Sequence, residues 1–436
     1  MVCGIGSPKV SWKASGAGAR VRTTVQLLVV SCGALGFGLP PKAHATTPLQ
    51  TISAGSFHTC TSRADGTLWC WGSNSSGQLG DGTMMDRSAP VQVLSLGTSV
   101  TRVSAGENFT CARTSNGTLW CWGDNGKGQV GDGTNTSRST PVQVSGLGAT
   151  VDVSAGGDHA CAIQSGGTLW CWGDNTQGQI GDGTNTARPA PVQVTSLGSS
   201  VLQVSAGEFH TCALKTDHTL WCWGYNQYGQ VGDGTMMARN VPVQVQVAST
   251  SFAQVSLGTY FTCARGTDGT LWCFGYNGAM AIGVGSTSMS ISTPVQVTTL
   301  NTDVLQVTTG DNHVCVRRSD FSVWCWGWNI DGQVGDGTMT TQPFPVPATA
   351  LNSSATDIDA GAFHTCARKP DGTIWCWGYN FFGMLGNGTT GNFSLTGVQV
   401  LLAFITSAVP AGGGLAASCL ALLLVGAAWR RPTGRR

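Results

Sequence analysis

The chain contains 436 residues, and its 23 Lys and Arg residues nearly balance its 22 Asp and Glu residues, for a formal net charge of +1. Nine of the basic residues lie within the first 45 and the last seven positions, where no acidic residue occurs, so the segment between them carries about −8. A mildly acidic segment without a stripe of Lys or Arg lacks the signature of a nucleic-acid-binding protein. We therefore expect no nucleic-acid partner.

Residues 1–45 have the composition of a secretory signal peptide. Basic residues precede an apolar run from Val25 to Leu39, and Ala43-His44-Ala45 supplies a small-residue cleavage site. Val30-Ser31-Cys32 weakly suggests a lipoprotein cleavage box, but we expect cleavage after Ala45. Export suits a cysteine-rich chain, because disulfides persist in oxidising compartments.

A hairpin motif follows and is repeated seven times. Its first copy runs from His58 to Gly72, where two apolar, aromatic-rich runs flank Asp65-Gly66, a strong hairpin signal. A three-residue loop would place Cys60 opposite Cys70, close enough for a disulfide. The spacing lacks the short Cys-x₂₋₄-Cys pattern of zinc sites, so we expect no metal. We predict the cross-strand disulfides Cys60–Cys70, Cys111–Cys121, Cys161–Cys171, Cys212–Cys222, Cys263–Cys273, Cys315–Cys325 and Cys366–Cys376.

The repeat sets the domain organisation, although the length alone would allow three domains. A glycine precedes each hairpin at intervals of 50 to 52 residues, at positions 55, 106, 156, 207, 258, 310 and 361. Each unit reads as a short β run, the hairpin, a glycine-rich turn and a Pro-Val-Gln-Val-like strand, without helical periodicity. Residues 46–403 are therefore predicted to form an all-β, seven-bladed propeller. We also expect the N- and C-terminal strands to share one blade, which would remove raw edges.

The units resemble the regulator-of-chromosome-condensation repeat, whose members form seven-bladed propellers. The resemblance rests on Ala-Gly before the hairpin, His two residues before the first Cys, Asp-Gly-Thr, Trp-Gly, Asn-x-x-Gly-Gln-x-Gly and Pro-Val-Gln-Val. It covers about Thr46 to Ala403. The cysteine pair departs from the eukaryotic pattern and is similar to a secreted bacterial branch. Nuclear members of the family act as guanine-nucleotide exchange factors, but export would remove that partner, so we do not expect this activity.

Most repeated residues are typical of a scaffold. Trp69 and Trp71 flank Cys70, so on a strand they face away from the disulfide and are predicted to pack between blades. The histidine position accepts Phe109 and Phe261, which indicates packing. The repeated Gly-Asp-Gly-Thr tract is interpreted as a turn rather than a calcium loop. Its aspartates are Asp81, Asp132, Asp182, Asp233 and Asp336.

No catalytic set or cofactor motif is visible, so we expect neither enzymatic activity nor a cofactor. The candidates for an enzymatic site at the channel mouth are Glu107, Glu208 and His218, which occur in single units.

The loop after each Trp-Gly differs between units. Units 1 to 3 carry small or polar residues there, whereas units 4 to 7 carry large aromatics, which are typical anchors of binding surfaces. Packing around a narrower central channel is the alternative interpretation. The candidate binding residues are Tyr225, Tyr228, Tyr276, Trp328, Tyr379, Phe381 and Phe382. The methionine pairs Met84-Met85 and Met236-Met237 are weaker candidates, because methionines suit adaptable contacts.

Residues 404–436 resemble a tripartite C-terminal sorting signal of Gram-negative bacteria. Gly412-Gly413-Gly414 precedes a short apolar run that ends at Trp429, and an arginine cluster follows. The run is just long enough to cross a bilayer, and the arginines would hold its end in the cytoplasm. We expect attachment to the membrane through this segment until it is processed; a permanent anchor is the alternative.

Together these features predict an exported, cell-surface or extracellular propeller that is monomeric and binds a protein or a surface carbohydrate. A secreted propeller of related build inhibits β-lactamases, so the alternatives are an enzyme inhibitor or an enzyme with a site at the channel mouth.

Overall fold

The computed structural model describes residues 51–402, with gaps at 248–249, 352–353 and 392. The predicted signal peptide and the predicted sorting signal lie outside these residues and stay predictions. No helix within the described ranges is long and apolar enough to span a membrane.

The first hairpin forms as predicted. Strands β2 (His58–Ser62) and β3 (Leu68–Gly72) pair antiparallel, with Cys60 directly opposite Cys70. Gly66 turns the chain with a φ of 77°, in the left-handed region that favours glycine, and its N–H donates to the Arg63 carbonyl at 2.9 Å. All seven predicted cysteine pairs are disulfide-bonded.

The described residues form seven four-stranded antiparallel sheets, each built from one repeat in chain order, which confirms the predicted fold class. Blade 1 holds β1 (Ile52–Ala54), β2, β3 and β4 (Arg87–Gln92). Blade 2 holds β5 (Val100–Ala105), β6 (Phe109–Thr114), β7 (Leu119–Gly123) and β8 (Arg138–Gln143). Blade 3 holds β9 (Thr150–Ala155), β10 (His159–Gln164), β11 (Leu169–Gly173) and β12 (Arg188–Gln193). Blade 4 holds β13 (Val201–Ala206), β14 (His210–Lys215), β15 (Leu220–Gly224) and β16 (Arg239–Gln244).

Blade 5 holds β17 (Phe252–Leu257), β18 (Phe261–Gly266), β19 (Leu271–Tyr276) and β20 (Ser290–Gln296). Blade 6 holds β21 (Val304–Thr309), β22 (His313–Arg318), β23 (Val323–Gly327) and β24 (Gln342–Pro347). Blade 7 holds β25 (Asp357–Ala360), β26 (His364–Arg368), β27 (Ile374–Tyr379) and β28 (Phe393–Gln399). Short 3₁₀ turns follow four of the outer strands: η1 (Leu94–Leu96), η2 (Thr195–Leu197), η3 (Thr298–Leu300) and η4 (Thr349–Leu351).

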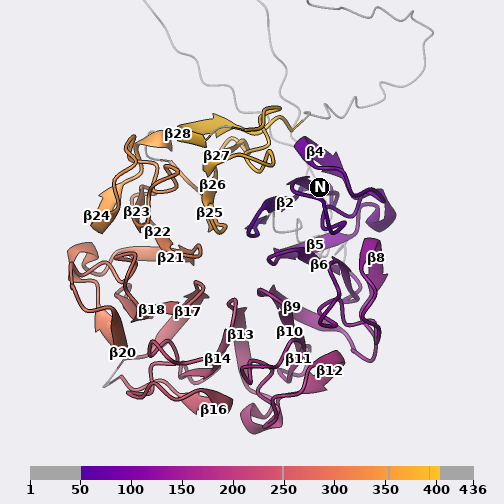
Figure 1. Cartoon of the computed structure of the whole chain (residues 1–436), viewed down its shortest axis with the longest axis horizontal. Helices are drawn as coiled ribbons and strands as arrows, with labels where there is room; N and C mark the ends of the chain where they lie inside the picture. The colour runs from indigo at the N-terminus through magenta and orange to yellow at the C-terminus, as the bar shows by residue number, and fades with distance from the viewer. Residues whose placement is uncertain (1–50, 248–249, 352–353, 392, 403–436) are drawn as a thin grey trace, which may run out of the picture. The chain divides into compact units, whose positions relative to one another are not determined.

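The seven sheets form a ring, with β5, β9, β13, β17, β21 and β25 near its centre and β4, β8, β12, β16, β20, β24 and β28 on its circumference (Figure 1). The expected blade of shared terminal strands is not shown. Within the described residues, the strands of blade 1 all come from the first repeat and those of blade 7 all come from the last.

Contacts between blades 7 and 1 close the ring, among them a backbone hydrogen bond from the Gly388 N–H to the Ser88 carbonyl at 2.8 Å. At an ordinary junction of inner strands a serine accepts from the next blade, as Ser53 Oγ does from the Ala105 N–H at 2.9 Å. At the closing junction Asp359 replaces the serine. Its carboxylate accepts from the Ala54 N–H of blade 1 at 2.8 Å and from the Thr308 hydroxyl of blade 6 at 2.7 Å. One aspartate therefore bridges three blades.

Of the two tryptophan positions predicted to pack between blades, that of Trp71 fills the interface, whereas that of Trp69 is only partly buried. Trp71 is fully buried, and its equivalents at 122, 172, 223, 326 and 377 are too. The Trp122 indole N–H donates to the Gln78 carbonyl of the preceding blade at 2.9 Å, so the polar atom of this large side chain is satisfied. The disulfide sulfurs belong to the same interface cores. Truncating such a buried side chain typically costs about 3–5 kcal/mol.

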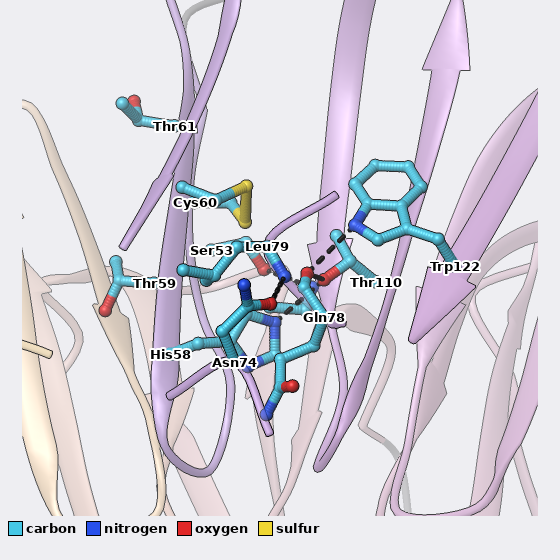
Figure 2. Close-up of a disulfide and its surroundings, with 12 residues drawn as sticks. Ser53, His58, Thr59, Cys60, Thr61, Asn74, Gln78, Leu79, Thr110 and Trp122 are labelled. Atoms are coloured by element: carbon cyan, nitrogen blue, oxygen red, sulfur yellow. Dashed lines mark hydrogen bonds between the residues drawn. A yellow bond between two sulfur atoms is a disulfide. The ribbon is translucent and has the colours of Figure 1, made fainter. Parts of the chain in front are cut away.

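Each repeated histidine joins its blade to the next one. His58 Nε2 lies 2.8 Å from the Thr110 hydroxyl of blade 2, and that hydroxyl lies 2.8 Å from the Gln78 carbonyl, which it can only reach as a donor (Figure 2). Since the hydroxyl has one proton, His58 Nε2 must carry the ring proton. His58 Nδ1 is then a bare acceptor, and it has no hydrogen-bond partner in the described part of the chain.

Burial lowers the pKa of these imidazoles far below the usual value, because a proton on Nδ1 would be buried without an acceptor. The pKa is about 3 at His58, His210, His313 and His364 and about 4 at His159. The histidines are therefore neutral structural groups, as the substitution by Phe indicated.

The two interfaces without histidine change on both sides. Where Phe109 replaces the histidine, the facing position in the next blade holds Ala160, and where Phe261 replaces it, the facing position holds Val314. A hydroxyl facing a phenyl ring would lose its donor, so the apolar partner removes an unsatisfied polar group. The residue at the histidine position and the residue that faces it in the next blade therefore change together.

Replacing His58 and Thr110 singly and together should show that the two substitutions are coupled. We expect His58→Phe alone and Thr110→Val alone each to lower the free energy of unfolding by about 1–3 kcal/mol, because each leaves one buried polar atom unpaired. The double variant should recover about 0.5–3 kcal/mol of coupling energy, measured by urea unfolding of the oxidised protein. Phe261→His with Val314→Thr is the reciprocal control. Simple additivity in both cycles would contradict the coupling.

The same double variant should change the pH dependence of stability. The unfolded chain protonates His58 below a pKa of about 6.5, whereas the folded chain does so only near 3. Acidification therefore favours the unfolded parent but not the variant. Between pH 6.5 and pH 4 the variant should gain about 3 kcal/mol relative to the parent, since one unit corresponds to about 1.4 kcal/mol per proton. Urea unfolding at several pH values measures this difference, and a constant difference would show that His58 titrates normally.

Candidate functional site

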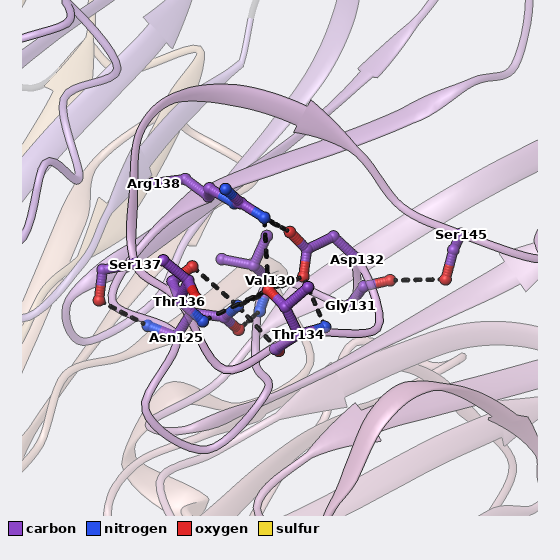
Figure 3. Close-up of polar contacts among 9 residues, drawn as sticks. All are labelled: Asn125, Val130, Gly131, Asp132, Thr134, Thr136, Ser137, Arg138 and Ser145. Carbon is purple, nitrogen blue, oxygen red and sulfur yellow. Dashed lines mark hydrogen bonds and ion pairs between the residues drawn. The ribbon is translucent and has the colours of Figure 1, made fainter.

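The loop between the third and fourth strands of each blade is rigid, because its own polar groups hold it. In blade 2 the Arg138 guanidinium pairs with the Asp132 carboxylate, whose other oxygen accepts from the Thr134 N–H (Figure 3). The Asn125 amide spans the loop by donating to the carbonyls of Thr134 and Thr136 at 3.0 and 3.1 Å. The repeated aspartates thus fasten turns, which confirms that interpretation. No group of three or more metal-ligating side chains is found in the described ranges.

These loops place three of the predicted binding residues in one aromatic group. Tyr225, Tyr228 and Tyr276 gather with Phe209 and Tyr260, which lie in the turns that precede β14 and β18. We call these five residues the tyrosine cluster. Its ring centroids are 4.9–6.3 Å apart, within the range of favourable aromatic contacts. All five side chains stay partly exposed.

Three further predicted residues form a second group across blades 7 and 1. Tyr379, Phe381 and Phe382 contact Phe57 and Phe363, with centroids 5.1–6.2 Å apart. We call this set the phenylalanine cluster. Phe381 is 55% exposed, so the cluster offers an apolar surface to solvent.

Trp328 is exposed and joins neither cluster. The predicted crescent therefore consists of two clusters with Trp328 as a separate residue. The contributions of Phe57, Phe209, Tyr260 and Phe363 were missed. All four occupy the second position after the repeated glycine, and that variable position was the available signal.

Carboxylates line the mouth of the central channel on the same side of the ring. Glu107, Glu208 and Asp311 directly follow the repeated glycines and line a cavity of about 300 Å³, together with Phe57 and Phe363. We call this the acidic mouth. Its lining residues include no Lys or Arg in the described part of the chain.

Burial and mutual repulsion raise the pKa of these carboxyl groups above the usual value. Burial and the nearby Asp311 raise the pKa of Glu208 to about 7. Burial raises the pKa of Asp311 to about 6. Asp158 does not line the cavity but follows its lining residue Gly157, and burial with the Glu107 charge raises its pKa to about 6. The Glu208 charge also contributes to the raised pKa of Tyr260, so the tyrosine cluster adjoins the acidic mouth.

The enzymatic candidates do not assemble into a site. Glu107 and Glu208 converge at the acidic mouth, but His218 lies beyond the other end of β14, in the hairpin turn. There it adopts a φ of 64°, and its Nδ1 lies 3.0 Å from the Phe252 carbonyl. His218 therefore occupies the usual glycine position of the turn. The predicted methionine pairs are 51–66% exposed and belong to neither cluster; Met236 and Met237 lie in the same loop as Tyr225 and Tyr228, where the Asn226 amide donates to the Met237 carbonyl.

Comparison with known proteins places this geometry in a family. The model of the RCC1-like domain matches residues 29–353, and that of the regulator of chromosome condensation (RCC1) repeat matches residues 355–383. The ultraviolet-B receptor UVR8 of Arabidopsis thaliana is 29% identical over 77% of this chain, which spans 66% of the receptor. The human E3 ubiquitin-protein ligase HERC2 is 29% identical over 77% of this chain, which spans only 6% of the ligase.

Solved structures agree on the fold. Human WBSCR16 is 25% identical with a TM-score of 0.67, covering 73% of this chain and 86% of that protein. Yeast RCC1 (Prp20), solved with Kap60, is 17% identical with a TM-score of 0.70, covering 86% of this chain and 91% of the yeast chain. Because the family model matches most of the chain, this protein belongs to the RCC1-like domain family.

Proposed function

We propose that this protein is a non-enzymatic binding propeller that holds a protein partner against its acidic mouth and the two aromatic clusters. The observation that carries the proposal is the gathering of partly exposed aromatic side chains on the side of the ring where the carboxylates lie. Large aromatics are the usual anchors of protein interfaces. The fold does not require the loop aromatics, since blades 2 and 3 form the same loops with small or polar residues.

The charge of the mouth indicates which side chain a partner would present. Carboxylates whose pKa is raised by burial gain most from a cation, because it relieves both desolvation and mutual repulsion. Aromatic faces also attract cations. A Lys or Arg of the partner, placed in the acidic mouth with apolar residues on the flanking clusters, would satisfy the whole surface.

Relatives support a binding role without naming this partner. Yeast Prp20p has been characterised for binding to Gsp1p and histones, which shows that this fold can serve as a protein-binding platform. Seven disulfides favour an oxidising compartment, and they support the proposal that the protein acts outside the cytoplasm. Surface attachment through residues 404–436, before any processing, belongs to the same proposal. We expect the propeller to act as a monomer.

Removing the aromatic anchors tests the binding face. The full chain carrying Tyr228→Ala, Tyr276→Ala and Phe382→Ala should retain at most one tenth of the parent's capture of envelope proteins, because each anchor typically contributes more than about 1 kcal/mol. Met84→Ala with Met85→Ala is the matched control, because these exposed apolar residues belong to neither cluster. Quantitative pull-down with folding verified by circular dichroism gives the readout. Equal capture by all three proteins would reject this face, and capture of polysaccharide alone would replace the protein partner with a carbohydrate.

Acidification should weaken the same interaction. Glu208, Asp158 and Asp311 are charged above pH 7 and become neutral between pH 7 and pH 5, as their pKa values of about 7 and 6 require. Affinity for a basic partner should therefore fall at least fivefold from pH 7.5 to pH 5.5. Glu208→Gln should reduce affinity at pH 7.5 and flatten this dependence, measured by surface plasmon resonance at low salt. Binding that strengthens on acidification would contradict a basic partner.

A further inference from the structure

The opposite end of the central channel has a different chemistry. A second cavity, of about 840 Å³, is lined by four arginines and three aspartates: Arg102, Arg265, Arg317, Arg368, Asp152, Asp357 and Asp359. We call this the arginine mouth. Its size lies in the range of small-molecule sites. The acidic mouth has no basic lining residue in the described part of the chain, so arginines line the channel at this second end only.

Three of these arginines occupy one structural position that the fold does not require to be basic. They are the fifth residues of strands β18, β22 and β26, counted from the start of each strand. The same position holds Ile163 in β10 and Leu214 in β14, where both side chains are at most 1% exposed. An apolar side chain therefore satisfies this position, and an arginine there pays a desolvation cost that packing does not demand.

Three of the four arginines have an aspartate nearby. Arg102 Nε lies 2.6 Å from the Asp152 carboxylate. Burial lowers the pKa of the Arg317 and Arg368 guanidiniums, and the nearby Asp357 carboxylate partly offsets this effect for both. One aspartate thus serves two arginines. It is also engaged elsewhere, since Asp357 accepts from the Gln306 amide at 2.8 Å.

Arg265 has no such compensation. No carboxylate lies within ion-pair distance of it among the described residues, its Nη1 reaches only the Gly266 carbonyl at 3.3 Å, and its Nε has no partner there. Burial lowers the pKa of this guanidinium, and no opposing charge counters the effect. A half-buried cation with donors left over is an incomplete interaction.

A neighbouring turn adds a second departure from the repeat. Phe321 takes the glycine position of the β22–β23 hairpin with a φ of 65°, a conformation that strains a bulky residue. Its ring is nevertheless 50% exposed, with its centroid 6.0 Å from the Arg317 guanidinium. Phe321 is not among the residues that line the cavity, but its contact with Arg317 places its ring beside a guanidinium that is.

We propose that the arginine mouth binds an anionic group of a small polar ligand, a carboxylate or a phosphate, between Arg265 and Arg317. Guanidinium groups match the planar, two-oxygen geometry of these anions. Gln203 and Gln254, on the adjoining inner strands, each use one amide N–H to bind the next blade and keep one for a ligand hydroxyl. Phe321 would cover one side of the bound group.

Calorimetric titration of the full chain tests the proposal, with inorganic phosphate and D-glucuronate as separate probes for the two anions. We expect saturable binding of at least one probe, weakened at least tenfold in Arg265→Gln and in Arg317→Gln. Arg318→Gln is the matched control. This substitution also removes one positive charge from β22, next to Arg317. The Arg318 side chain, however, pairs with Asp303 and lies over the Trp324 ring, outside the cavity. The control should bind like the parent.

Thermal unfolding separates this role from a structural one. Because Arg265 is uncompensated, Arg265→Gln should unfold at the same or a higher temperature without ligand and should lose the stabilisation that the ligand confers on the parent. The variant with the three aromatic substitutions should bind the anions like the parent. A negative result for partner binding at the acidic mouth therefore leaves the anion-binding proposal unaffected. No saturable binding, equal weakening in Arg318→Gln, or a lower unfolding temperature for Arg265→Gln would each overturn it.

Discussion

Contact between neighbouring blades is the interaction on which the rest of this structure depends. A four-stranded sheet cannot cover its own two faces, so each blade buries them against its neighbours and the ring must close. Every interface is filled by a large aromatic side chain, a disulfide and a histidine or phenylalanine. Even the repeated glycine belongs to this contact: a Cβ at Gly55 would lie 2.3 Å from the Gly106 carbonyl of the next blade and 2.8 Å from the His58 ring.

The polar groups in these interfaces form closed sets, which makes the repeat intolerant of single changes. The Gln78 carbonyl accepts from both the Thr110 hydroxyl and the Trp122 indole, and the hydroxyl accepts from His58. Removing one member leaves another unpaired in a dry interior. The seven units therefore either keep the whole set or exchange it for an apolar one, as at Phe109 and Ala160. Positions outside the interface escape this demand and differ between units.

Those free positions lie at the two mouths of the channel, where the first and second strands of each blade begin and end. The acidic mouth gathers carboxylates from turns of blades 2, 4 and 6, and the arginine mouth gathers arginines from strands of blades 2, 5, 6 and 7. Each blade contributes one or two groups to a site that no blade contains alone. A rigid ring holds these groups at fixed spacing, which is how a repeat scaffold acquires distinct binding surfaces.

The local features of this protein could be read from its sequence, whereas the sites could not. Disulfide pairing follows from the register of one hairpin, because Cys60 and Cys70 lie five residues from the middle of the same turn. The structural role of the histidines follows from the Phe residues that replace them. By contrast, the rings of Phe209 and Tyr260 stack with their centroids 5.5 Å apart, although the two residues lie in neighbouring blades and 51 positions apart in the chain. Each occupies a variable turn position, so the repeat pattern did not reveal the contact. Arg265 and Arg317 occupy the same repeat position as the buried core residues Ile163 and Leu214. The structure alone shows that the two arginines line a cavity. The sequence by itself determined the blade, since hairpin register and strand pattern are short-range. The tertiary structure alone decided how the ring closes and what its mouths present, because those contacts join residues about 50 to 300 positions apart.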